Sequence, residues 1–179
     1  MNTRQDDARA AKDTAIAEVL ADGHVEIDLA DPPTREELGL VGDADDAYLE
    51  NKDLSSFRVT VTFSDGHVLS TDHVNVLGVR TAASGEVDRL LVGVHQLSLD
   101  DVAQRLETAV GDFGVDPGDV RSFLSSAESA PDLGRIVTAT LPTTGIAAPE
   151  TLEIEPTVNE DQQNNLINYR ISFEPRAAS

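Results

Sequence analysis

Two histidine–aspartate pairs near one turn are the residues of this chain best suited to chemistry. His67 follows Asp65 across the turn at Gly66, and His73 follows Asp72 a few residues later. A histidine beside a carboxylate can act as a general base or bind a metal ion. Because this spacing matches no established ligand motif, we assign neither a catalytic nor a metal site. The four side chains remain weak candidates for both.

The acidic segment that precedes these pairs is a second, weaker candidate, because clustered oxygen ligands suit calcium. It departs from the calcium-binding loop of EF hands, since Ala47 stands where a ligand belongs and Tyr48 stands where the tight turn needs glycine. We therefore expect Val41 to Ser56 to form a solvated loop without a metal. Its carboxylates are those of Asp43, Asp45, Asp46, Glu50 and Asp53.

Other catalytic patterns are missing from the sequence. Without cysteine, the chain has no disulfide, no thiolate nucleophile and no cysteine-ligated metal. The triplet from Asp112 to Gly114 spells the magnesium-binding motif of kinases, but no glycine-rich loop accompanies it. The serines lie in no nucleophile elbow, and no phosphate-binding or dinucleotide-binding glycine pattern occurs. We therefore expect no cofactor.

Charge is the strongest global signal, with 13 basic and 33 acidic side chains and a net charge of −20. Such a surface repels phosphate backbones and anionic lipids, so we expect neither nucleic-acid binding nor direct binding to an anionic membrane. Abundant aspartate with few lysines fits a high-GC bacterium or a salt-adapted organism. Composition does not choose between the two.

The stretch from Glu86 to Leu124 organises the rest of the chain. It predicts a strand followed by two helices, because apolar residues recur at spacings of three and four from Leu99 to Phe113. Ser98 and Asp116 are suited to begin the two helices as N-caps. A polar linker from 125 to 134 is expected after the pair.

Strands are predicted on both sides of this helical pair. Phe57 to Phe63 alternates apolar and polar residues, and the next segment changes phase around Gly78, which indicates a bulge there. After the helices, residues 135–141 are β-prone, and a short strand should end at Pro156. In the last strand, Leu166 to Phe173, alternation places Asn168, Arg170 and Ser172 outward.

The fold class that follows is α+β. We expect a two-layer domain with a mainly antiparallel sheet, in the order β-meander, helical pair, β-meander, with the helices on one face. Residues 23–176 should form this single domain. Residues 1–22 should form an extra N-terminal helix. This helix could serve as a stalk, because Thr3 to Asp13 offers no apolar side chain larger than alanine for burial.

No family resemblance supports a specific function. The leading hypothesis is a non-catalytic binding or protein-interaction domain with an unknown protein partner. We expect it to be the extracytoplasmic part of a bacterial protein anchored in the membrane by a tether outside this chain. One alternative is a small hydrolase that uses His67 or His73 with a neighbouring aspartate. Another is a cytoplasmic protein of a salt-adapted cell.

Overall fold

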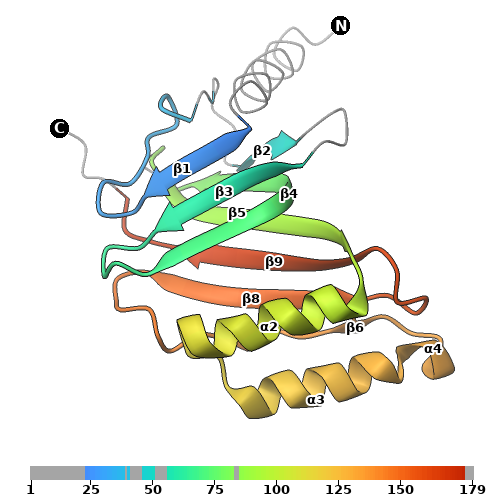
Figure 1. Cartoon of the computed structure of the whole chain (residues 1–179). Helices are drawn as coiled ribbons and strands as arrows, with labels where there is room; N and C mark the ends of the chain where they lie inside the picture. The colour runs from blue at the N-terminus through green and yellow to red at the C-terminus, as the bar shows by residue number, and fades with distance from the viewer. Residues whose placement is uncertain (1–22, 39, 41–45, 51–55, 83–84, 176–179) are drawn as a thin grey trace, which may run out of the picture.

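The chain has a mixed α and β fold, and its described residues form a nine-stranded, mostly antiparallel sheet and three helices (Figure 1). The computed structural model describes residues 23–38, 40, 46–50, 56–82 and 85–175, and structural statements below concern these residues. The elements are β1 (His24–Asp28), β2 (Asp46–Glu50), β3 (Phe57–Thr62), β4 (Val68–Thr81), β5 (Val87–Leu97), α2 (Leu99–Phe113), α3 (Pro117–Glu128), α4 (Ala130–Leu133), β6 (Val137–Thr138), β7 (Leu141–Pro142), β8 (Thr151–Val158) and β9 (Asn165–Ser172).

The strand order in the sheet is β1-β3-β4-β5-β9-β8-β6, with β2 paired to β4 and β7 paired to β8. The consecutive strands β3, β4 and β5 pair antiparallel, which confirms the predicted first meander. Strand β1 pairs with β3 in parallel. Strand β4 serves two sets of neighbours: its first half pairs with β3, and its second half pairs with β2 and β5.

Helices α2 and α3 begin and end as their sequences predict. Ser98 accepts a hydrogen bond from the Asp101 backbone N–H, and the Asp101 carboxylate accepts one from the Ser98 N–H, which completes a capping box. Gly114 ends α2 in the left-handed conformation. Asp116 caps α3, whose first residue is Pro117.

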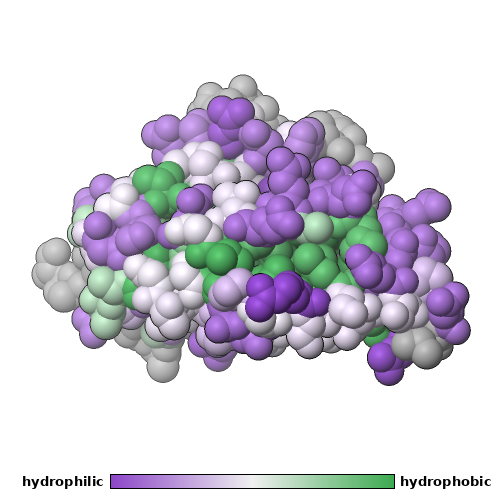
Figure 2. All heavy atoms as spheres, turned by 60° about the horizontal axis from the view of Figure 1, so that its bottom comes forward, coloured by the Kyte–Doolittle hydropathy of each residue, from purple (hydrophilic) through white to green (hydrophobic). Residues whose placement is uncertain are grey.

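The core cluster combines buried strand residues with the apolar stripe of α2, whose buried members are Val102, Leu106, Ala109 and Phe113. On β9, the alternate residues Ile167, Tyr169 and Ile171 are buried, as their spacing predicts. Figure 2 shows the side of the molecule that is lowest in Figure 1, where hydrophobic residues form a broken band between hydrophilic areas. This side is therefore not uniformly polar, despite the net charge of −20.

Two predicted loops contain regular structure instead. Strand β2 lies within the segment expected to be a loop, because Leu49 is 1% exposed and gives the strand a buried residue. The expected polar linker after Leu124 is helical: α3 continues to Glu128 and α4 follows, with Ala127 and Ala130 fully buried. The sequence did not indicate this packing, because the buried residues are small and the residues around them are polar.

Two strand predictions also need correction. Strand β8 continues through Pro156, whose carbonyl accepts a bond from Ala139 N–H on the side away from β9. A proline there removes no hydrogen bond from the β8–β9 ladder. The bulge predicted at Gly78 lies earlier, where the β4–β5 register shifts between Val74 and Val76. The predicted N-terminal helix at 1–22 lies outside the described residues.

Candidate functional site

The Asp65–His67 pair forms at the β3–β4 turn, and its contacts are those of a turn. His67 Nδ1 lies 2.9 Å from Asp65 Oδ1, and the other carboxylate oxygen accepts a 2.7 Å bond from Ala147 N–H. Backbone donors, Ala147 first, lower the pKa of Asp65 to about 2. Beside them, Ser64 Oγ donates to Glu150 at 2.7 Å. Asp65 and Ser64 thus join the turn to the loop before β8.

The second pair, Asp72 and His73, lies in the middle of β4 and has different partners. His73 Nδ1 is 3.1 Å from Ser56 Oγ, while the Asp72 carboxylate accepts a bond from Arg58 Nε. That bond lowers the pKa of Asp72. A cavity of about 350 Å³ opens here, lined by His24 and His73 among other residues. Because Asp72 pairs with Arg58, no described carboxylate orients the His73 ring for base catalysis.

These two pairs do not form one site. His67 and His73 are separated by six residues of nearly extended chain, which is roughly 20 Å at about 3.3 Å per residue. No described group of three or more acidic or histidine residues could hold a metal ion. Of the acidic-segment candidates, Asp43, Asp45 and Asp53 lie outside the described residues. Asp46 and Glu50 lie in β2, where only the backbone is described.

One edge of β4 carries backbone groups that no described strand pairs with. Phe63 N–H donates to the His67 carbonyl at 2.8 Å, so the odd-numbered residues that follow in β4 direct their backbone groups to β3. Val68 and Ser70 therefore direct their N–H and C=O groups to the opposite edge. Strand β5 pairs with β4 only from Val74 onward.

Helix α2 lies beside this open edge, and a groove of about 320 Å³ separates them. At one end Arg105 Nη1 donates to Thr71 Oγ1 at 2.7 Å, and at the other the ring of Phe113 lies 6.5 Å from that of Phe63. The helix contributes a row of polar side chains spaced by three and four residues, which lie on one helical face. The row consists of Asp101, Gln104, Thr108 and Asp112.

Charge and burial differ between the rim and the floor of this groove. On the rim, hydrogen bonds from Ser98 lower the pKa of Asp101, which keeps that carboxylate ionised. On the floor, Tyr169 is 4% exposed. Burial raises the pKa of its hydroxyl, and the Arg105 guanidinium opposes part of that rise. The groove thus combines an open strand edge, acidic side chains on its helical rim and the buried ring of Tyr169 on its floor.

Sequence reasoning did not identify this groove. Thr71 and Arg105 are 34 residues apart, and Tyr169 comes from the last strand, where its alternation indicates only a core residue. The polar row on α2 has helical spacing, but the same spacing is typical of an ordinary solvated face. No local pattern shows that β5 leaves half of β4 uncovered.

Comparisons with known proteins assign this chain to no family. No protein-family model, curated protein or solved structure matches it. Within the described residues, no helix combines the length and the apolar character needed to cross a membrane.

Proposed function

We propose that this chain is a non-catalytic protein-interaction domain that binds an extended, basic segment of its partner as an added strand. The observation that carries the proposal is the open edge of β4 at Val68 and Ser70, which faces the groove beside α2. An exposed strand edge pairs readily with another extended chain. Main-chain hydrogen bonds then supply affinity, and neighbouring side chains supply specificity.

The carboxylates along the groove favour a partner segment with basic side chains. Asp101 and Asp112 lie along its helical wall, and the chain as a whole carries −20. Lysine or arginine side chains on the added strand would meet carboxylates, and the field of the domain would speed their encounter. The ring of Tyr169 on the floor would contact alternate side chains that point inward.

Peptide titrations with matched variants test this proposal. A peptide of alternating lysine and valine should bind, whereas one of alternating glutamate and valine should not. Ser70→Pro removes the N–H at the open edge while leaving the β3 side of the ladder intact, so it should weaken binding at least tenfold. Ser70→Ala is its control and should bind like the wild type. Equal affinity of both variants would contradict strand addition.

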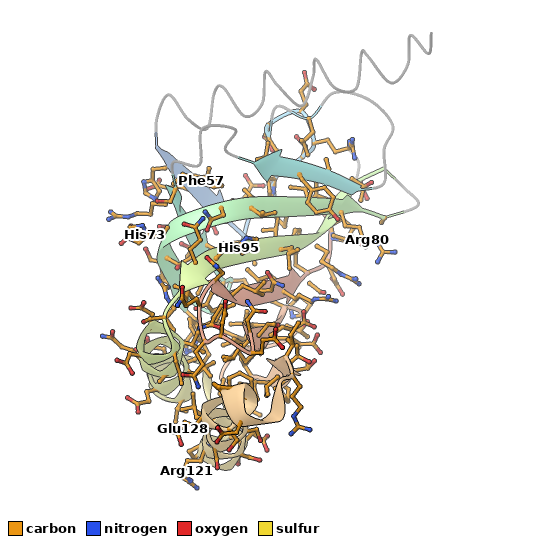
Figure 3. The ribbon with its side chains drawn as sticks, turned by 90° about the vertical axis from the view of Figure 1, so that its right-hand side faces the viewer. Phe57, His73, Arg80, His95, Arg121 and Glu128 are labelled. Atoms are coloured by element: carbon orange, nitrogen blue, oxygen red, sulfur yellow. The ribbon has the colours of Figure 1, made fainter. Side chains whose placement is uncertain are left out.

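Two further variants, each of which removes one negative charge, test the same proposal without changing the backbone. Asp112→Asn should weaken binding of the lysine–valine peptide several-fold and flatten its salt dependence. Glu128→Gln removes the same charge from α3, away from the groove, and should change nothing (Figure 3). If the two variants weaken binding equally, only the net charge of the domain attracts the peptide.

The proposal includes the arrangement and location expected from the sequence. We take the fold as two layers with the helices on one face of the sheet, which the burial of the α2 stripe supports. We take the domain as extracytoplasmic and tethered, on the strength of its acidity and its lack of cysteine. Fractionation of native cells tests the location, since a tethered protein sediments with membranes and a salt-adapted cytoplasmic one does not.

A small hydrolase is the second candidate, and the Ser56–His73 contact of 3.1 Å favours it. Ester hydrolysis that is lost in both Ser56→Ala and His73→Asn would establish it. Rates that equal the buffer blank for the wild type would remove it, whatever the outcome of the peptide titrations.

A further inference from the structure

Three arginines gather on the face of the sheet opposite to the one that packs on α2. Arg80 of β4 pairs with Arg89 of β5, and Arg170 of β9 lies diagonal to Arg89. Paired residues of antiparallel strands point to the same face. Because Tyr169 lines the groove at α2, its neighbour Arg170 points to the other face.

Two of these guanidiniums have no partner in the described part of the chain. No hydrogen bond or ion pair joins Arg80 or Arg89 to another described residue, and the buried Nε of Arg89 has no acceptor. Arg170 differs, because its Nε donates to Glu155 at 2.7 Å. Like charges placed opposite each other across a strand pair destabilise a sheet. Asp46 stands opposite Arg80 in the β2–β4 register, and its side chain lies outside the described part of the structure. Among the described side chains, no carboxylate pairs with Arg80 or Arg89, which leaves two like charges side by side.

A small cavity lies among these side chains, with a volume of about 160 Å³. Its apolar wall is formed by Tyr48 and Leu91 over the bare backbone of Gly78. A Cβ at Gly78 would lie 3.0 Å from the Leu91 Cβ and 3.3 Å from the Tyr48 ring, so the glycine allows both side chains to approach. The cavity thus joins an apolar wall to two guanidiniums that pair with no described carboxylate.

We infer that this cavity binds a small organic carboxylate, with its charged group on Arg80 and Arg89 and its apolar body against Tyr48 and Leu91. The planar guanidinium matches the two oxygens of a carboxylate. The volume limits the ligand to a compact acid, and the apolar wall favours an organic body over a bare inorganic anion. The site is independent of the peptide groove, because it lies on the other face of the sheet.

Calorimetric titration with three probes tests the inference. Benzoate supplies a carboxylate on a flat apolar body, benzamide has nearly the same shape without the charge, and inorganic phosphate has the charge without the body. We expect saturable binding of benzoate, with benzamide and phosphate each at least tenfold weaker. Phosphate that binds as tightly as benzoate, or benzamide that does, would overturn the inference.

Matched variants locate the binding. Arg80→Gln and Arg89→Gln should each weaken benzoate binding about tenfold or more, which is the usual size of a lost charge-assisted pairing. Arg121→Gln removes the same charge from α3, well below Arg80 in Figure 3, and should bind like the wild type. Arg80 is exposed, so its variant stays informative if Arg89→Gln folds poorly. Unchanged affinity in Arg80→Gln, or equal losses in Arg80→Gln and Arg121→Gln, would contradict the assignment.

Discussion

Arg105 Nη1 donates a hydrogen bond of 2.7 Å to Thr71 Oγ1, and this contact joins helix α2 to the half of β4 that β5 leaves uncovered. Thr71 is 3% exposed, so its hydroxyl has little access to water. The bond therefore holds the helical wall of the groove at a fixed distance from the strand edge. Loss of the bond should affect both stability and peptide binding.

Arg105→Ala should lower the free energy of unfolding by about 1–3 kcal/mol, because it leaves the buried Thr71 hydroxyl without its donor. Urea denaturation measures the change. Thr71→Val removes both the hydroxyl and its need for a partner, so the double variant should be less destabilised than the sum of the two single changes. Strict additivity would show that the bond contributes nothing.

The packing of α2 gives a prediction about the core. Leu106 is fully buried, and Leu106→Ala should destabilise the protein by about 2–4 kcal/mol. Ile136 is 59% exposed, so Ile136→Ala should change the free energy of unfolding by no more than about 0.5 kcal/mol. Denaturation midpoints that coincide for Leu106→Ala and the wild type would contradict the position of α2 on the core.

Acid should weaken the fold partly through Asp65. The pKa of Asp65 is about 2 in the folded protein against 3.8 for the free side chain, so its contribution is present above about pH 4. The contribution is lost as the pH falls from about 4 to about 2, because protonation removes the negative charge that strengthens the hydrogen bonds from the Ala147 and His67 N–H groups. The difference in urea midpoint between wild type and Asp65→Asn should therefore shrink across this range. A difference that stays constant with pH would contradict the low pKa.

Salt separates the extracytoplasmic proposal from the salt-adapted alternative. Screening of a net charge of −20 should raise the melting temperature over the first few hundred millimolar of KCl and then level off, because the Debye length falls to about 3 Å at 1 M. Calorimetry in KCl measures the curve. A melting temperature that climbs steeply into the molar range would favour the salt-adapted protein.

The two long helices were predictable because their signals are local. The cap at Ser98, the apolar spacing of α2 and the turn at Gly114 all lie within 17 residues. Strand β2 was not predictable in this way, because Leu49, the buried one of its three described side chains, stands among carboxylates. The parallel pairing of β1 with β3 rests on contacts about 34 residues apart, which no turn signal specifies.

The candidate sites show the same difference between contacts within a short segment and contacts between distant segments. Asp65 and His67 are neighbours in sequence and do meet, but in a turn. The groove and the arginine cavity depend on which strand lies beside which and on where β5 stops pairing with β4. Alternation predicts that Arg170 points outward, and only the strand order brings it near Arg89.

Amide hydrogen exchange at Val68 and Ser70 tests the central claim most directly. In the free protein both N–H groups face the open edge and should exchange far faster than those of Leu69 and Thr71, which face β3. Saturation with the lysine–valine peptide should slow exchange at Val68 and Ser70 and leave Leu69 and Thr71 unchanged, because only the open edge gains acceptors. If the peptide binds and the exchange of Val68 and Ser70 stays fast, the bound segment is not an added strand on β4, and the account is wrong.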